Sequence, residues 1–173
     1  MINTGHGYIR TTDPDDAPAF ARLYDPLGPP RAAALDLRRE PILPSVDEVR
    51  EMLARQETRQ GAVYTVENRE GEVRGFCSVR GVNAEAAFGE MAVMFADPAD
   101  YAAPLAEEAA HFLFERAYAR QRLAKLIGHA LDGECELREF FARLGFEHCG
   151  VQREVLHARG RWHDLETFSH FKA

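Results

Sequence analysis

The feature that most constrains the fold is an apolar stretch near the middle of the chain that runs directly into a helix. Residues 86–95 have the composition of a buried strand, and Asp97-Pro98 marks its end. Pro104 then opens a helix that extends to about residue 120, because proline favours the first helical position. A strand that leads into a helix N-terminus leaves backbone N–H groups exposed, and such a junction often binds phosphate. The sequence therefore predicts a strand–turn–helix unit whose backbone N–H groups could bind an anion.

The turn in this unit lacks the residues that usually complete a phosphate-binding loop. Residues 99–106 contain no glycine and no basic side chain. Acidic residues lie in or beside the turn: Asp97, Asp100, Glu107 and Glu108. At an effective dielectric constant near 20, one such charge about 6 Å from an anion costs roughly 3 kcal/mol before screening, although carboxylates at a helix start also stabilise the helix dipole. Arg138 or Arg143 would offset this charge if either side chain reaches the turn.

Length and composition describe an ordinary globular chain. Its 173 residues suffice for one domain with its own core, expected over residues 1–173, and hydrophobic residues make up 46%. The formal net charge of −7 argues against a nucleic-acid partner, because such partners are bound through basic surfaces. No apolar run approaches the ~20 residues of a membrane span, and the first residues lack the features of a secretory signal. We therefore expect a cytoplasmic protein with no membrane partner.

The cysteines do not predict a metal site or a disulfide framework. Cys77, Cys135 and Cys149 form no Cys-x-x-Cys pair, and the scattered histidines show no metal-ligand spacing. We interpret each cysteine as a small buried hydrophobic residue.

Turn residues and hydrophobic spacing divide the rest of the chain into helices and strands. Asp13-Pro14 starts one helix, and Ser45 starts a second through a capping box with Glu48. Residues 26–44 carry five prolines, so a loop is predicted there, with one helical turn near residues 33–37. The other expected elements are strands at 8–10, 62–67, 73–82, 86–95, 123–131, 151–157 and 161–171, and helices at 104–120 and 134–144, with Gly145 following the last helix.

This order of elements predicts an α+β fold. The helix at 104–120 connects two strands in a chain whose other strands follow one another as a meander. Such a crossover makes its two flanking strands parallel, whereas meandering strands are antiparallel. We therefore expect a mixed, mostly antiparallel sheet with a central parallel strand pair and flanking helices.

Several segments, taken together, resemble the GNAT superfamily of acyl-CoA-dependent N-acyltransferases. They are Gly71–Phe76, Asp97-Pro98 with Leu105–Ala109, Phe140–Phe146 with its closing Leu-Gly-Phe, and Gly150–Glu154 with Gly160–Asp164. Their order and spacing carry the likeness over nearly the whole chain. The likeness is greatest to the branch that includes the ribosomal-protein-alanine acetyltransferases.

The resemblance implies how such a protein would bind its acyl donor, acetyl-CoA. The two parallel strands would splay apart, and the pantetheine chain of the donor would enter between them. The implied pantetheine contacts are the main-chain groups of Phe95 and Ala96. The implied pyrophosphate contacts are the N–H groups of Ala102, Ala103, Leu105 and Ala106.

Other residues depart from the family pattern. Tyr101 stands at the basic position of the phosphate loop, and Pro104, which has no N–H, stands at its second glycine. Glu134 stands where asparagine is frequent. Phe141 stands where a tyrosine commonly protonates the departing thiolate, so that proton would come from water, Tyr101 or Cys135 instead.

N-acyl transfer needs a base that removes a proton from the acceptor ammonium group, and a donor at the thioester carbonyl. Glu90, at the start of the apolar strand, is the predicted base, because burial next to that strand would make its carboxylate a better proton acceptor. A backbone N–H of the splayed strand is the predicted carbonyl donor. His129 on the neighbouring strand is a second candidate base, because imidazole exchanges protons near neutral pH. A purely structural role stays open for both side chains.

The sequence thus predicts an acyl-CoA-dependent N-acyltransferase, most simply an acetyl-CoA N-acetyltransferase. The resemblance implies direct attack by a primary amine in a ternary complex, with a small molecule or a protein N-terminus as the acceptor. The alternative is a GNAT-like protein that has lost catalysis and acts as a binding or regulatory subunit. Pairing of edge strands into a homodimer is compatible with either reading.

Overall fold

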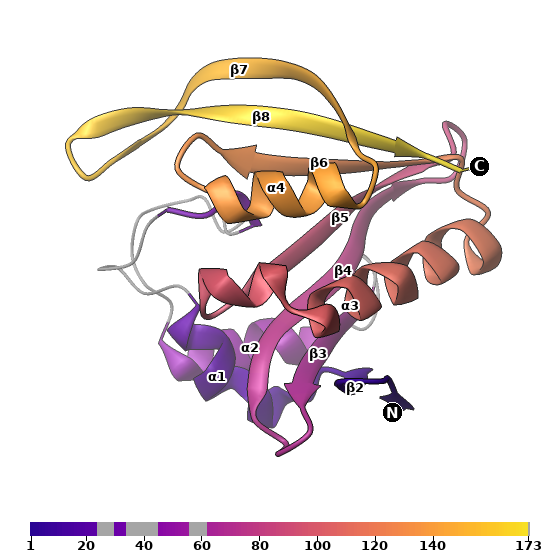
Figure 1. Cartoon of the computed structure of the whole chain (residues 1–173). Helices are drawn as coiled ribbons and strands as arrows, with labels where there is room; N and C mark the ends of the chain where they lie inside the picture. Colours follow the sequence, from indigo (N-terminus) through magenta and orange to yellow (C-terminus); the bar gives the residue numbers. More distant parts are fainter. Residues whose placement is uncertain (24–29, 34–44, 56–61, 173) are drawn as a thin grey trace.

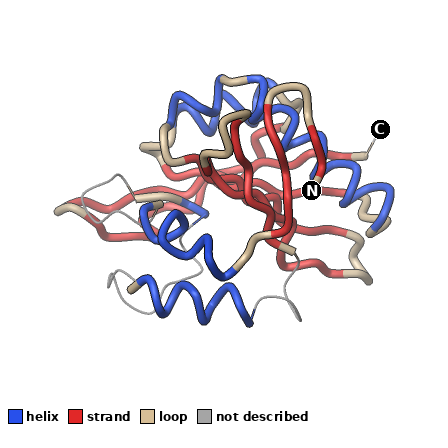
Figure 2. Tube along the Cα trace, turned by 90° about the horizontal axis from the view of Figure 1, so that it is seen from below, coloured by secondary structure: helices blue, strands red, loops and turns tan. Residues whose placement is uncertain are grey.

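The computed structural model describes residues 1–23, 30–33, 45–55 and 62–172 (Figure 1). Among these residues, eight strands form one sheet in the order β1-β2-β3-β4-β5-β6-β8-β7, and Figure 2 shows helices on both sides of it. The strands are β1 (Ile2–Asn3), β2 (Gly7–Thr11), β3 (Val63–Asn68), β4 (Val73–Asn83), β5 (Phe88–Phe95), β6 (Lys125–Leu131), β7 (Glu147–Ala158) and β8 (Arg161–Phe171). The helices are α1 (Ala17–Arg22), α2 (Val46–Arg55), α3 (Pro104–Phe114) and α4 (Cys135–Arg143), with the short turns η1 (Pro14–Asp16) and η4 (Pro98–Ala102) and the π-helical turn η5 (Glu115–Arg120).

Local sequence signals start and end the helices as predicted. The Asp13 side chain caps η1, and Asp16 completes the capping box. Ser45 and Glu48 form a second capping box, in which each side chain accepts from the backbone N–H of the other residue at 3.2 and 2.7 Å. Gly145 follows α4 with φ +83°, a conformation that glycine adopts without strain. These contacts satisfy helix-end groups that would otherwise lack partners.

The central strands diverge as the fold class predicts. β5 and β6 are parallel and pair only from Phe88 to Glu90, opposite Lys125 to Ile127. Beyond that point β5 stays paired with β4, and β6 stays paired with β8. We call the diverging segments, Met91–Phe95 and Gly128–Leu131, the fork. All other strand pairs among the described residues are antiparallel, so the mixed, mostly antiparallel sheet is confirmed.

Each face of the sheet carries its own core. Side chains alternate between faces along a strand, so Met94 packs with α1 and α2 on one face while Val93 and Phe95 pack with α3 and α4 on the other. Leu126 and Ala130 of β6 lie on the α3–α4 face as well. The fork is therefore placed between two helical layers, and its backbone lies in the plane between them.

Gly75 on β4 occupies a position where a larger residue is expected to destabilise the sheet. A Cβ atom there would press against the carbonyl oxygen of Met94 and lie 2.7 Å from Cδ1 of Phe95. Because the backbone of a central strand cannot move aside cheaply, we expect Gly75→Ala to lower the free energy of unfolding by about 1–3 kcal/mol. Gly133→Ala is the matched control, since the nearest atom to its added Cβ is 3.7 Å away. Urea unfolding of both variants checks this, and equal losses would contradict it.

Some sequence expectations fail or lie outside the described residues. Cys77 is buried, but Cys135 and Cys149 are exposed, because they lie at the start of α4 and on the edge strand β7. The predicted long helix is α-helical only to Phe114 and continues as the π-helical turn η5. Most of the predicted loop at 26–44, including its helical turn beyond residue 33, lies outside the described residues. No helix in the described ranges is long and apolar enough to span a membrane.

Candidate functional site

The fork presents peptide groups of β5 that have no strand opposite them in the described part of the chain. Ala96 donates its N–H to the Arg74 carbonyl at 2.9 Å, and peptide groups alternate in direction along a paired strand. The groups of Val93 and Phe95 therefore face away from β4, toward the fork. Beyond Glu90 no strand of the described chain pairs with this side of β5. An extended ligand that carries amides could pair there as an added strand does.

Two side chains of the chain itself bind the carbonyl groups of this segment. Tyr101 donates its hydroxyl hydrogen to the Val93 carbonyl at 3.1 Å. Arg31 donates from Nη1 to the Phe95 carbonyl at 2.7 Å and from Nη2 to the Ala96 carbonyl at 3.3 Å. Tyr101 is only 3% exposed. Its ring packs edge-on against Phe95, with centroids 5.2 Å apart, and lies 5.6 Å from Phe140 on α4.

Glu134 ties the other arm of the fork to the same segment of chain. Its Oε2 accepts the N–H of Leu131 at 2.9 Å and the N–H of Ala32 at 2.8 Å. Burial raises the pKa of Glu134, and the two N–H donors and the Arg31 charge oppose that rise only in part. Since Arg31 binds β5 and the next residue binds Glu134, these two consecutive residues connect the arms of the fork.

The turn after β5 uses several of the amides that were predicted to bind a pyrophosphate. Ala103 donates its N–H to Asp100 and Ala106 donates to Ala103, both at 3.0 Å. Pro104 has no N–H. Leu105 is the second residue of α3, a position whose amide has no partner within the helix. Ala102 is the last residue of η4. The pyrophosphate contacts therefore stay a prediction, with the Leu105 amide the one best placed by the helix geometry.

The acidic residues around this turn all have partners in the structure. They are Asp97 with the N–H of Ala99 at 2.9 Å, Asp100 with Arg74 at 2.9 Å, Glu107 with Arg143 at 3.7 Å, and Glu108 with His6 at 2.9 Å. Arg143 also donates to the Tyr101 carbonyl at 2.6 Å. Of the two arginines that the sequence offered to offset the acidic charge, Arg143 reaches the turn, whereas Arg138 pairs with Glu166.

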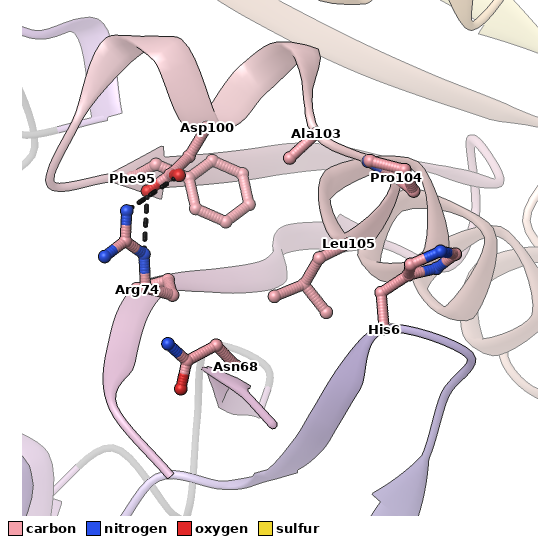
Figure 3. Close-up of a pocket in the computed structure, with 8 residues that line it drawn as sticks. All are labelled: His6, Asn68, Arg74, Phe95, Asp100, Ala103, Pro104 and Leu105. Atoms are coloured by element: carbon pink, nitrogen blue, oxygen red, sulfur yellow. Dashed lines mark hydrogen bonds and ion pairs between the residues drawn. The ribbon is translucent and has the colours of Figure 1, made fainter. Parts of the chain in front are cut away.

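A pocket of about 200 Å³ lies beside this turn, at the N-terminal end of α3. Figure 3 shows Arg74 reaching across its wall to Asp100, with Leu105 between Arg74 and His6. The complete lining is His6, Asn68, Arg74, Phe95, Asp100, Ala103, Pro104 and Leu105. Arg74 is a cation near the turn that the sequence motifs did not indicate, because it comes from the start of β4.

Glu90 lies at the branch point of the fork. It is the last β5 residue that pairs with β6, opposite Ile127. Its Oε1 accepts from Nη2 of Arg80 at 2.6 Å, and Arg80 also donates to the Ala33 carbonyl. Because side chains alternate along β5, Glu90 lies on the same face as Met94, the face that carries α1 and α2.

His129 and Phe141 lie on opposite faces of β6. The alternation of β6 places His129 on the α1–α2 face, where its Nδ1 is 3.3 Å from Oγ1 of Thr167. Phe141 of α4 covers the other face, and its ring would collide with a Cβ at Gly128. The structure thus brings both candidate bases, Glu90 and His129, to one face of the fork.

Sequence reasoning missed Arg31 as a residue of this site. Arg31 lies in the proline-rich segment, 64 residues from its partner Phe95, and no motif surrounds it. One feature of the sequence pointed to Glu134: it stands where the GNAT family often has asparagine.

The fork, with the turn η4 and helix α3 that follow β5, is the arrangement expected of the class of acyl-CoA-dependent acyltransferases. Within that class, the chain belongs to the family of acetyltransferase (GNAT) domains, which matches residues 8–147. Members of this family use acetyl-CoA as the acetyl donor. No curated protein matches the sequence of this chain.

Similar solved structures support the same fold. The spermidine N-acetyltransferase from Vibrio cholerae in complex with CoA and spermine has a TM-score of 0.79 and 15% identity, covering 97% of this chain and 96% of that one. A chimera of Vibrio cholerae spermidine N-acetyltransferase SpeG and hSSAT has a TM-score of 0.78 and 16% identity, covering 96% of each chain. A probable acetyltransferase has a TM-score of 0.76 and 22% identity, covering 98% of this chain and 94% of that one. At these identities the likeness shows the fold alone.

Proposed function

We propose that this protein transfers an acetyl group from acetyl-CoA to a primary amine by direct attack in a ternary complex. The observation that carries the proposal is the fork, in which the N–H groups of Val93 and Phe95 face a side of β5 where no strand of the described residues pairs. Membership of the acetyltransferase (GNAT) family supports the same reaction. The proposal places this activity in the cytoplasm.

The acceptor in this proposal is the amine of a small molecule or of a protein N-terminus. Structural neighbours named as spermidine N-acetyltransferases support the first kind. The likeness to the ribosomal-protein-alanine branch, carried by the closing segments around Gly150 and Gly160, supports the second. A homodimer paired through edge strands is part of the proposal and can be measured by light scattering.

Glu90 is the proposed proton acceptor for the ammonium form of the acceptor. It lies at the branch point of the fork, so a proton transferred there leaves a free amine beside the gap between the two arms. The N–H groups that face the gap can stabilise negative charge on the thioester carbonyl oxygen. Phe141 carries no proton to give, so the departing thiolate takes its proton from water or from a hydroxyl that reaches the fork.

The proposal is tested by following CoA release in the presence of a panel of amines. Purified protein is mixed with acetyl-CoA and either spermidine, a peptide with an N-terminal alanine, or a small monoamine, and the acetylated product is identified by mass spectrometry. We expect release that depends on both the acceptor and the protein. No product with any amine, and no heat with millimolar acetyl-CoA or CoA in calorimetry, would instead indicate a catalytically silent protein.

One observation favours the silent alternative. The carbonyl groups of Val93 and Phe95 are already bound by Tyr101 and Arg31. In a silent protein these two side chains would keep acetyl-CoA out of the fork. In an active protein they would have to yield when acetyl-CoA enters.

A further inference from the structure

The residues of the fork fit acetyl-CoA only in part. The N–H group of Val93 fits a ligand that contributes a carbonyl oxygen, whereas the N–H group of Phe95 already interacts with the Tyr101 hydroxyl oxygen. The two carbonyl groups in the same segment fit the N–H groups of such a ligand less well, because side-chain donors 3.1 and 2.7 Å away already occupy one of the two acceptor positions of each oxygen. An amide-bearing ligand that pairs with both kinds of group therefore meets the Tyr101 and Arg31 side chains at these oxygens.

The two competing side chains reach the fork from different parts of the chain. Tyr101 comes from η4 and belongs to the core on the α3–α4 face. Arg31 comes from the segment whose next residue, Ala32, packs with Leu131 and Leu165. Leu131 alternates with Ala130, so it faces away from the α3–α4 core. The carbonyl side of β5 is thus covered from both faces of the sheet.

The position of Tyr101 is fixed by more than its own hydrogen bond. Its ring is enclosed by Phe95 and Phe140. Its carbonyl accepts from Arg143, and its neighbour Asp100 is bound by Arg74. Burial raises the pKa of the Tyr101 phenol, with the nearby Arg31 charge opposing the rise, so the hydroxyl stays protonated and remains a hydrogen-bond donor at neutral pH. A donor held in this way competes continuously with any incoming N–H.

From this geometry we infer that Tyr101 and Arg31 determine the affinity of the fork for acetyl-CoA by occupying the carbonyl groups of Val93 and Phe95, and that both side chains leave these groups when the donor enters. The inference rests on the proposed function, since it concerns the same site. It gives these residues a role opposite to that of a binding residue: the protein binds its donor more weakly because they are present.

Calorimetry of conservative variants tests the inference. Tyr101→Phe keeps the packed ring and removes only the hydroxyl, so acetyl-CoA should bind about 3–10-fold more tightly, as expected for one competing hydrogen bond. Arg31→Met keeps a long side chain and removes the guanidinium, and a similar gain is expected. Tyr118→Phe is the matched control, because the Tyr118 hydroxyl contacts His170 and not the fork; its affinity should equal that of the wild type.

A spectroscopic measurement reports the movement of Tyr101 without relying on affinity or activity. The protein is labelled with 3-fluorotyrosine, and the Tyr101 resonance is identified by its absence in Tyr101→Phe. Addition of acetyl-CoA should change the chemical shift of this ¹⁹F resonance, because the hydroxyl loses its Val93 partner while the ring stays packed against Phe95 and Phe140. A resonance that is unchanged at saturating donor overturns the inference.

The outcomes separate the inference from the proposed function. If the wild type binds acetyl-CoA and neither variant binds more tightly, the inference fails and the function stands. If the wild type neither binds nor reacts while the Tyr101→Phe, Arg31→Met double variant binds, the function of the natural chain fails and the inference stands. If no variant binds at millimolar donor, the inference fails together with the function.

Discussion

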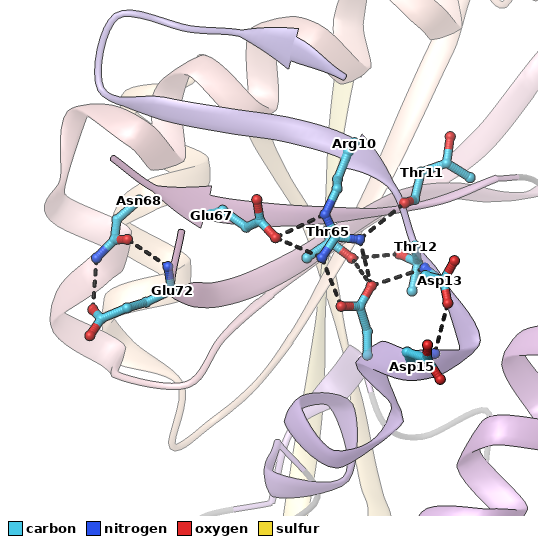
Figure 4. A network of polar contacts seen from close by, with 10 residues as sticks. Arg10, Thr11, Thr12, Asp13, Asp15, Thr65, Glu67, Asn68 and Glu72 are labelled. Carbon is cyan, nitrogen blue, oxygen red and sulfur yellow. Dashed lines mark hydrogen bonds and ion pairs between the residues drawn. The ribbon is translucent and has the colours of Figure 1, made fainter. Parts of the chain in front are cut away.

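Replacement of Arg10 by methionine is expected to lower the free energy of unfolding by about 3 kcal/mol. Arg10 lies on β2 and binds two carboxylates: its Nη1 and Nη2 donate to Asp16 at 2.7 and 2.8 Å, and its Nε and Nη2 donate to Glu67 at 2.8 and 2.6 Å (Figure 4). Both carboxylates are buried. Without the guanidinium, two negative charges would remain together away from water, and Asp16 would keep only the hydrogen bonds from Thr65 and from the Asp13 N–H.

Urea unfolding measures this loss, with Arg50→Met as the matched control. Arg50 also pairs with an aspartate, Asp47 at 2.6 Å, but the carboxylate side chain is 87% exposed. Exposed pairs of this kind contribute little, so the control should lose no more than about 0.5 kcal/mol. Equal losses in the two variants would show that the Arg10 cluster contributes no more than a surface pair.

The same cluster predicts how stability depends on pH. Burial raises the pKa of Asp16, but hydrogen bonds from Arg10, the Asp13 N–H and Thr65 outweigh it, so the net shift is downward from the usual 3.8. A carboxyl group whose pKa is lower in the folded state contributes stability that is complete above its unfolded pKa and is lost as pH falls through the folded pKa. We therefore expect stability to fall as pH decreases below about 4. The fall should be smaller in Arg10→Met, because its neutral-pH stability has already lost this contribution.

The position of the fork could be predicted from the sequence because its cause is local. The helix that starts at Pro104 forces the strands before and after it to be parallel, and the apolar run of residues 86–95 identifies the first of them. The N-cap at Asp13 and the capping box at Ser45 are likewise contained within four residues. Each of these predictions depends on groups that are neighbours in the chain, so one sequence is enough to make them.

The side chains that enter the fork could not be predicted in the same way. The Arg31–Phe95 contact spans 64 residues and the Ala32–Glu134 contact spans 102. Tyr101 was recognised as a departure from a basic residue and as one possible proton donor to the departing thiolate. Nothing in its local sequence indicates that its hydroxyl turns back to Val93. These contacts depend on how distant segments pack, which hydrophobic spacing does not encode.

The partner of Glu90 illustrates the same limit over a shorter distance. Arg80 and Glu90 are directly opposite each other on β4 and β5, and such cross-strand pairs interact. The meander of strands was predicted, but its register was not, and a shift of one residue would have moved Arg80 to the other face. The sequence predicted a Glu90 carboxylate among apolar groups. In the structure this carboxylate instead accepts a hydrogen bond from the guanidinium of Arg80.

Glu90→Gln is expected to reduce kcat/KM for acetyl transfer by roughly 10²–10⁴-fold, the usual contribution of a general base. Glutamine has the same shape and can still accept from Arg80, so the unfolding free energy and the affinity for acetyl-CoA should change little. Glu70→Gln, in the exposed turn between β3 and β4, is the control and should retain full activity. If activity survives the substitution, Glu90 is not the base, and His129, which lies on the same face of the fork, becomes the residue to substitute.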